Sequence, residues 1–295
     1  MELLAVKRAS VAFVLLGLLG LNFAPALGQG TGKKLKVFLL AGQSNMEGKG
    51  DGGKLTEAEK KDLEAAGKRI KFAYNHEPIR PLSVTEASAG LKKKFEVESV
   101  FGPELFFGLK MAAAWPDQEF LFIKRSVGAT SLYGRWNPDW TAEKAAKMGE
   151  EKAPPLYADF IGYVREVLGA YKPEEYEICG MLWVQGEADG DPKRGIEPAE
   201  AYGENLQNLI TRVRKDTGVP ELPFLLVQVG FGQVTEGMQA TAGAMKNVSL
   251  IPQSKDPASP NFFPKYPVGH YNYEGMKRIG SLLADEYLKR HATHG

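Results

Sequence analysis

Four short stretches of the chain are almost continuously apolar, at residues 37–41, 120–123, 178–184 and 224–229. Each is followed by a glycine or a polar residue. Continuous rather than alternating hydrophobicity is typical of strands that are buried on both faces of a sheet. We therefore predict buried strands at these four positions.

Between and after these stretches, apolar residues recur at helical spacing. The amphipathic pattern predicts helices at 103–114, 157–171, 198–217 and 273–290. Strands that alternate with amphipathic helices are typical of βαβ units around a mainly parallel sheet. We predict an α/β fold, a three-layer α/β/α sandwich, with a single core over about 33–290.

The beginning of the chain has the features of a secretory signal. Two basic residues precede an apolar run at 11–21, and small residues follow up to Gly28. This pattern predicts a signal peptide at 1–28 and a single domain at 29–295, in a secreted or periplasmic protein. An uncleaved anchor is the alternative interpretation, although the apolar run is short for a bilayer span.

The charge balance bears on the partners. The chain has 37 Lys and Arg against 36 Asp and Glu, a net charge of +1. We therefore expect no nucleic-acid partner and no stable membrane insertion after signal removal. The most basic cluster, 92–94, is interpreted as a solvated surface turn. The four histidines lack paired ligand spacing, so no metal site is predicted. Nothing in the sequence indicates the oligomeric state.

Polar residues and glycines follow three of the predicted strands, at 42–45, 126–130 and 185–187. Ligands of open parallel sheets bind beyond the carboxyl ends of the strands, so these segments are expected to lie together. The glycine-rich segment 48–53 lacks the spacing of a phosphate-binding loop, and we interpret it as a flexible surface loop.

Ser44 stands at the end of the first predicted strand. Its hydroxyl can act as a nucleophile or cap a helix, and the nucleophile needs a base. His270, just before the last predicted helix, is a candidate base, although its composition context alone favours a structural role.

Four segments with the sequences LLAGQSNMEG, SVGATSL, LWVQGEAD and HYNYEGMKRIG follow one another along the chain. In these segments the chain resembles the sialate O-acetylesterase and carbohydrate esterase family 6 group of SGNH-type hydrolases. The resemblance covers nearly the whole chain after the signal. It implies a flavodoxin-like sandwich and a secreted carbohydrate O-acetylesterase that needs no cofactor. The implied substrates are acetylated xylan-type glycans or sialic acid.

The resemblance also implies roles for individual residues. Ser44 is the expected nucleophile and His270 the general base. The expected oxyanion donors are the backbone N–H groups of Ser44 and Gly128 and the side-chain amide of Gln185. The expected substrate-binding residues are Gln43, Asn45, Thr130 and Trp136, with core packing as the alternative role for the tryptophan.

One position departs from the family pattern. SGNH relatives place an aspartate three residues before the histidine, where this chain has Pro267. Glu187 is the leading candidate for the acid and Asp189 the second. In one alternative, Glu187 has a purely structural role and braces loops by accepting backbone N–H bonds. In the other, a carbonyl oxygen orients the histidine in place of a carboxylate. Two other functions remain open: a non-catalytic glycan-binding protein, and an esterase or thioesterase for other acyl groups.

Overall fold

A computed structural model describes residues 34–291, and the predicted signal peptide at 1–28 lies outside them. The strands of the large sheet in this part of the chain are β1 (Leu35–Gly42), β3 (Ile70–Tyr74), β4 (Arg80–Pro81), β7 (Phe120–Ser126), β8 (Tyr176–Val184), β9 (Phe224–Val227) and β10 (Val248–Ile251). Their order is β10-β9-β8-β1-β7-β3-β4, and every neighbouring pair is parallel except β3 and β4. The predicted mainly parallel sheet is confirmed.

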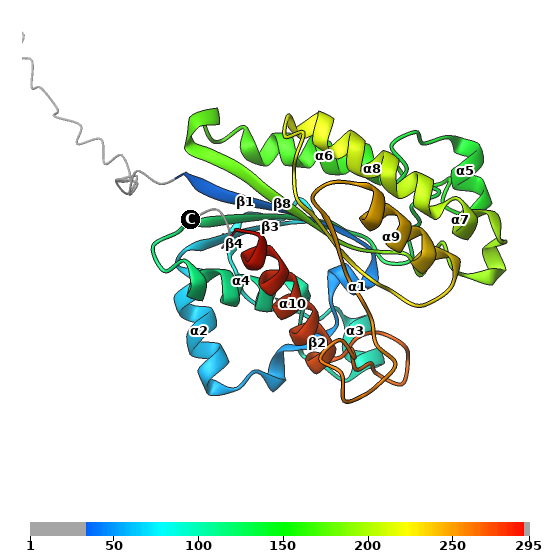
Figure 1. Cartoon of the computed structure of the whole chain (residues 1–295). Helices are drawn as coiled ribbons and strands as arrows, with labels where there is room; N and C mark the ends of the chain where they lie inside the picture. The colour runs from blue at the N-terminus through cyan, green and yellow to red at the C-terminus, as the bar shows by residue number, and fades with distance from the viewer. Residues whose placement is uncertain (1–33, 292–295) are drawn as a thin grey trace, which may run out of the picture. The chain divides into compact units, whose positions relative to one another are not determined.

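Helices cover both faces of this sheet (Figure 1). One face is covered by α6 (Leu156–Leu168) and α8 (Tyr202–Thr217), and the other by α2 (Glu57–Gly67), α4 (Pro103–Ala114) and α10 (Tyr273–His291). The other helices are α1 (Ser44–Glu47), α3 (Ala89–Phe95), α5 (Ala142–Lys147), α7 (Glu197–Glu200) and α9 (Gln233–Ala244). The fold is the expected α/β/α sandwich. Within residues 34–291, no helix combines the length and apolar composition that a membrane span requires.

The structure divides or shortens three of the predicted elements, whereas β1, β7 and β8 extend beyond their predicted ranges. The predicted helix at 198–217 is divided into α7 and α8 at Ala201. Helix α6 ends at Leu168 and not at 171. Strand β9 ends at Val227 and not at 229, although the backbone N–H of Gln228 still donates to the carbonyl of Ile251 at 2.9 Å.

The glycine-rich segment 48–53 is part of the packed fold, so its interpretation as a flexible surface loop is wrong. Within it, β2 (Gly50–Asp51) pairs with β6 (Ser99–Phe101), which also pairs with β5 (Thr85–Glu86). A Cβ atom on Gly48 would lie 2.1 Å from the Cα of Gly102. The glycine therefore allows two backbone segments to pass in contact.

The three central strands end at the same level. Gly42, the last residue of β1, pairs with Ser126 on β7 and with Val184 on β8. A Cβ atom on Gly42 would lie 2.1 Å from the carbonyl oxygen of Val184, so only glycine fits there. The segments that follow β1, β7 and β8 consequently meet at one edge of the sheet.

Candidate active site

Ser44 is the first residue of α1, directly after β1. Its hydroxyl does not cap the helix, since the N-cap position is Gln43. Instead, Ser44 Oγ lies 3.0 Å from Nε2 of His270. Helix α1 is fixed from below by the fully buried Met46 and by Lys124, whose Nζ donates to the carbonyl of Glu47 at 3.0 Å. The serine therefore sits on a rigid turn with a base within hydrogen-bond distance.

His270 reaches Ser44 from the loop before α10. The next backbone N–H, that of Tyr271, donates to Asn45 Oδ1 at 3.3 Å and ties this loop to α1. Burial lowers the pKa of the His270 imidazole, and the charges of Lys94 and Lys49 lower it further, against a raising effect of Glu47. The imidazole is consequently neutral at neutral pH, as a general base must be. Its Nδ1 is buried and makes no hydrogen bond of good geometry within residues 34–291, although the backbone of Val268 is close enough to raise the pKa of the ring.

Glu187 lines the same cavity as His270 but does not bond to it. Asn45 Nδ2 donates to Glu187 Oε1, while Glu187 Oε2 is buried and unpartnered among residues 34–291. Burial raises the pKa of the Glu187 carboxyl, and the bond from Asn45 lowers it. In this structure Glu187 reaches the histidine loop through Asn45, which bonds to the neighbouring Tyr271.

Asp189, the second candidate acid, faces the interior. It is fully buried and accepts from the backbone N–H groups of Leu132 and Tyr133 at 2.9 and 2.8 Å. It also accepts from Gln185 Nε2 at 2.6 Å. Burial raises the pKa of Asp189 to about 7, against the lowering effect of these donors. Asp189 therefore joins the segment after β7 to the segment after β8, away from Ser44.

Gln185 does not offer its amide to the cavity. The side chain is fully buried, and its Nε2 contacts Asp189 Oδ2, the carbonyl of Thr130 at 3.0 Å and Gln43 Oε1 at 3.3 Å. An amide nitrogen carries two hydrogens, so none remains for an oxyanion. The expected role of Gln185 as an oxyanion donor does not fit this arrangement.

Gly128 lies against the serine, as the expected donor role requires. A Cβ atom built on it would be 3.6 Å from Ser44 Cβ. Its N–H is occupied, however, because it donates to Glu47 Oε1 at 2.9 Å.

The expected substrate-binding residues divide into two pairs. Gln43 and Asn45 line the cavity. Thr130 and Trp136 lie beneath it: Trp136 is fully buried, donates to Thr130 Oγ1 at 3.0 Å and packs edge-on against Trp183. Their expected contact with substrate is thus wrong for this structure, and core packing is the role of Trp136.

The cavity around Ser44 has a volume of about 470 Å³. Besides the residues named above, three charged side chains that the sequence analysis did not select line it, namely Lys94, Asp191 and Arg194. Lys94 belongs to the basic cluster 92–94, in which Lys93 and Lys94 are exposed as expected, but the cluster forms the last turn of helix α3 and not a loop turn. In the sequence these three residues are distinguished only by their charge. They reach the cavity because α3 and the segment after β8 pack beside Ser44, which the sequence pattern does not reveal.

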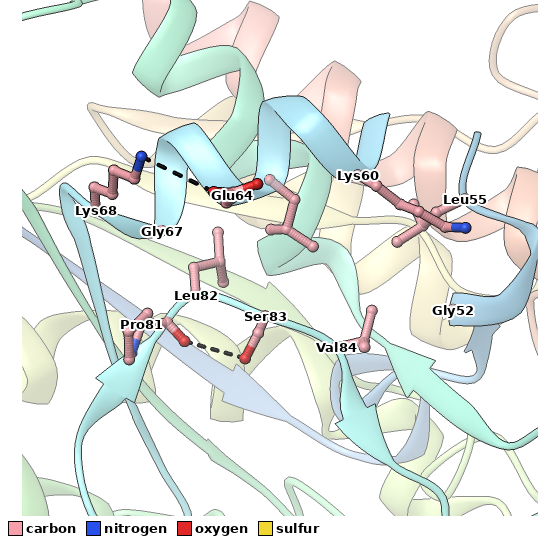
Figure 2. A pocket seen from close by; sticks show the side chains of 11 residues that line it. Gly52, Leu55, Lys60, Glu64, Gly67, Lys68, Pro81, Leu82, Ser83 and Val84 are labelled. Carbon is pink, nitrogen blue, oxygen red and sulfur yellow. Dashed lines mark hydrogen bonds and ion pairs between the residues drawn. The ribbon is translucent and has the colours of Figure 1, made fainter. Parts of the chain in front are cut away.

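A larger cavity, of about 580 Å³, lies between α2 and the segment 81–84 (Figure 2). Its walls are mainly aliphatic, with Leu55, Leu63, Leu82 and Val84. It contains no histidine or cysteine and no serine that is paired with a base. The pair formed by Ser44 and His270 lies in the smaller cavity.

The chain is similar in sequence to known carbohydrate esterases. Residues 34–289 match the family model described as carbohydrate esterase, sialic acid-specific acetylesterase. A probable carbohydrate esterase of Arabidopsis thaliana is 31% identical over 115 residues, which is 38% of this chain and 41% of that protein.

Solved structures agree in fold. The crystal structure of an Arabidopsis thaliana protein has a TM-score of 0.63 and 21% identity, covering 87% of this chain and 99% of its own. The crystal structure of NanS has a TM-score of 0.56 and 15% identity, covering 88% and 98%. At such identities the likeness concerns the fold.

Proposed function

The chain belongs to the carbohydrate esterase family of sialic acid-specific acetylesterases, and from this premise we propose that it removes acetyl groups from carbohydrates through an acyl-enzyme on Ser44. The carrying observation is the 3.0 Å contact between Ser44 Oγ and His270 Nε2 within the cavity. A serine hydroxyl is a weak nucleophile until such a base accepts its proton.

The steps follow from the positions of these two side chains. Ser44 Oγ attacks the acetyl carbonyl carbon while its proton passes to His270 Nε2. The tetrahedral intermediate collapses, and the sugar alcohol leaves with the proton from His270. Water, deprotonated by the same nitrogen, then attacks the acetyl-serine and releases acetate.

The oxyanion needs preorganised N–H donors close to Ser44. The backbone N–H of Ser44 has no acceptor among the described residues, and that of Gly128 is adjacent. For the third donor we assign Gln43 in place of Gln185. Gln43 Oε1 accepts from the backbone N–H of Ala188 at 3.3 Å, which fixes the amide orientation and leaves its NH₂ group for the cavity.

Glu187 is assigned as the acid behind His270. Among residues 34–291, Oε2 of Glu187 is the buried carboxylate oxygen that lacks a partner, and Nδ1 of His270 is the buried imidazole nitrogen that lacks one. A carboxylate oxygen is the acceptor that an imidazole N–H needs to stay in the correct tautomer. Asp189 does not fit this role, since its oxygens are held by buried donors.

The substrate is assigned as an acetylated glycan or sialic acid outside the cytoplasm. Family membership supports a carbohydrate, and the charged rim of Lys94, Asp191 and Arg194 suits a hydroxyl-rich leaving group better than a long acyl chain. The signal pattern at 1–28 supports secretion.

The test is acetate release from acetylated xylan and O-acetylated sialic acid by the purified protein. Ser44→Ala and His270→Ala are each expected to lower kcat at least about a thousandfold. His76→Ala is the matched control, because His76 pairs with Asp159 at 3.2 Å, outside the cavity. Wild-type turnover that survives in Ser44→Ala would refute the mechanism.

A non-catalytic glycan-binding protein is the second candidate. The unpartnered Nδ1 of His270 and the occupied N–H of Gly128 favour it. It predicts glycan binding with no turnover of any acetyl ester. The third candidate is an esterase for other acyl groups. Hydrolysis rates for a series of aryl esters of increasing acyl chain length test it, because such an enzyme would prefer chains longer than acetyl.

A further inference from the structure

The N–H of Gly128 is occupied by a carboxylate that comes from the same helix as the nucleophile. Ser44 and Glu47 are the first and last residues of α1, three positions apart, and so lie on one side of the turn. A Cβ atom on Gly128 would be 3.6 Å from Ser44 Cβ and 3.4 Å from Glu47 Oε2. The hydroxyl and the carboxylate therefore approach Gly128 together.

The contact has the geometry of an oxyanion contact. Donors in oxyanion holes lie about 2.7–3.1 Å from the oxygen that they stabilise. Glu47 Oε1 accepts from the Gly128 N–H at 2.9 Å. An acyl oxygen bound there would meet a carboxylate of the same charge sign, so the two cannot share the donor.

Glu47 has another partner to which it can turn. Lys49 Nζ lies 3.0 Å from Glu47 Oε2, and the Lys49 side chain is only 8% exposed. The backbone of Glu47 is held, since Lys124 donates to its carbonyl. Movement is thus confined to the side chain, which keeps its charge compensation when it leaves Gly128.

We propose that Glu47 occupies the oxyanion position in the substrate-free protein and is displaced toward Lys49 when the acyl carbonyl binds. The inference rests on the proposed function and adds to it a residue that sets how readily a carbonyl reaches its donor. Glu47 competes with the substrate carbonyl for the N–H of Gly128, and Lys49 binds the displaced carboxylate.

The experiment uses the full chain and the variants Glu47→Ala, Lys49→Met and their double variant. Two rates are measured: kcat/KM for a small aryl acetate, and the second-order rate of Ser44 labelling by a small aryl phosphonate. The phosphonyl oxygen uses the same donors as an oxyanion. Glu57→Ala and Lys60→Met are matched controls, because Glu57 and Lys60 form an exposed ion pair at 2.7 Å that does not line the cavity.

We expect Glu47→Ala to raise both rates about five- to tenfold, because it removes a charge-assisted competitor. Lys49→Met is expected to lower both by a similar factor, since Glu47 then bonds only to Gly128. The double variant is expected to match Glu47→Ala, and the control variants to match wild type. A purely structural role for Glu47 predicts a fall in Glu47→Ala.

Three results would overturn the inference. One is slower labelling in a Glu47→Ala protein that melts like wild type. Another, independent of variant folding, is a crystal structure of phosphonylated wild-type protein in which Glu47 still accepts from Gly128. Both leave the proposed function intact. The third, absence of turnover and of Ser44 labelling in wild type and every variant, rejects the proposed function as well.

Discussion

Asp189 and Glu187 lie two residues apart in the segment after β8, and their carboxylates have opposite surroundings. Asp189 accepts three N–H bonds, two from backbone and one from Gln185. Glu187 accepts from Asn45 alone among the described residues, and its Oε2 has no partner. The bonds of Asp189 are those of a structural group, whereas Glu187 keeps one oxygen that can accept a further hydrogen bond.

The same contrast separates the layer under the cavity from the cavity itself. Below α1, Lys124 is almost fully buried but donates to Glu104 at 2.6 Å and to the carbonyl of Glu47. In the cavity, Nδ1 of His270 has no partner among residues 34–291. Complete hydrogen bonding gives the support its rigidity, and incomplete bonding leaves the site groups free to take new partners.

The largest effect that tests this contrast is on folding. Asp189→Ala strands the two buried backbone N–H donors of Leu132 and Tyr133, each of which costs about 1–3 kcal/mol, so we expect the free energy of unfolding to fall by about 4 kcal/mol. Urea unfolding of the full chain measures it. Asp62→Ala, at an exposed position of α2, is the control and should stay within about 0.5 kcal/mol. A loss below 1 kcal/mol for Asp189→Ala would break the comparison.

Next in size is the effect of Glu187→Gln on turnover. Glutamine keeps an oxygen for Asn45 but places an NH₂ group where Oε2 stood. We expect kcat to fall about a hundredfold, equivalent to about 2.7 kcal/mol, with unchanged urea unfolding. Full activity in Glu187→Gln would show that this carboxylate does not assist His270.

The smallest effect concerns pH. Burial and the charges of Lys94 and Lys49 lower the pKa of His270 below its usual 6.5, while Glu47 opposes them. Because protonation removes the base, kcat/KM is expected to fall with decreasing pH, with a midpoint below 6.5. Lys94→Met removes a positive charge that lowers the pKa of His270, so the midpoint should rise. Lys93→Met, whose side chain does not line the cavity, should leave it in place.

A midpoint that does not move in Lys94→Met would show that this lysine is too well solvated to act on the imidazole. Glu47 provides a second test of the same pH profile. Glu47 raises the pKa of His270, so the Glu47→Ala protein should have a midpoint lower than that of wild type.

Much of the fold could be predicted from hydrophobic pattern. Strands β1, β7 and β8 are buried between neighbours on both sides, which produces the continuous apolar runs that marked them. The apolar run of β3 is interrupted by the exposed Lys71 and that of β10 by Ser249, so neither strand produced a continuous run. The burial of Gly48, Gly50 and Gly52 escaped prediction, because glycine marks flexible turns and close backbone contacts alike.

The candidate site was predictable to the level of segments and not of side-chain directions. The ends of β1, β7 and β8 meet because parallel strands end at one edge. Whether Gln185 faces the cavity or the interior depends on Asp189, and whether Trp136 stacks on sugar or packs in the core depends on Trp183. Those partners are known only after the chain has folded.

The contact between Ser44 and His270 joins residues 226 positions apart. Closing so long a loop is among the slower steps in folding, because chain entropy opposes contacts between distant residues. The nucleophile therefore acquires its base only when the loop before α10 has docked on the finished sheet. Esterase activity should consequently return later than the secondary structure during refolding, which makes the reaction a reporter of the last docking event.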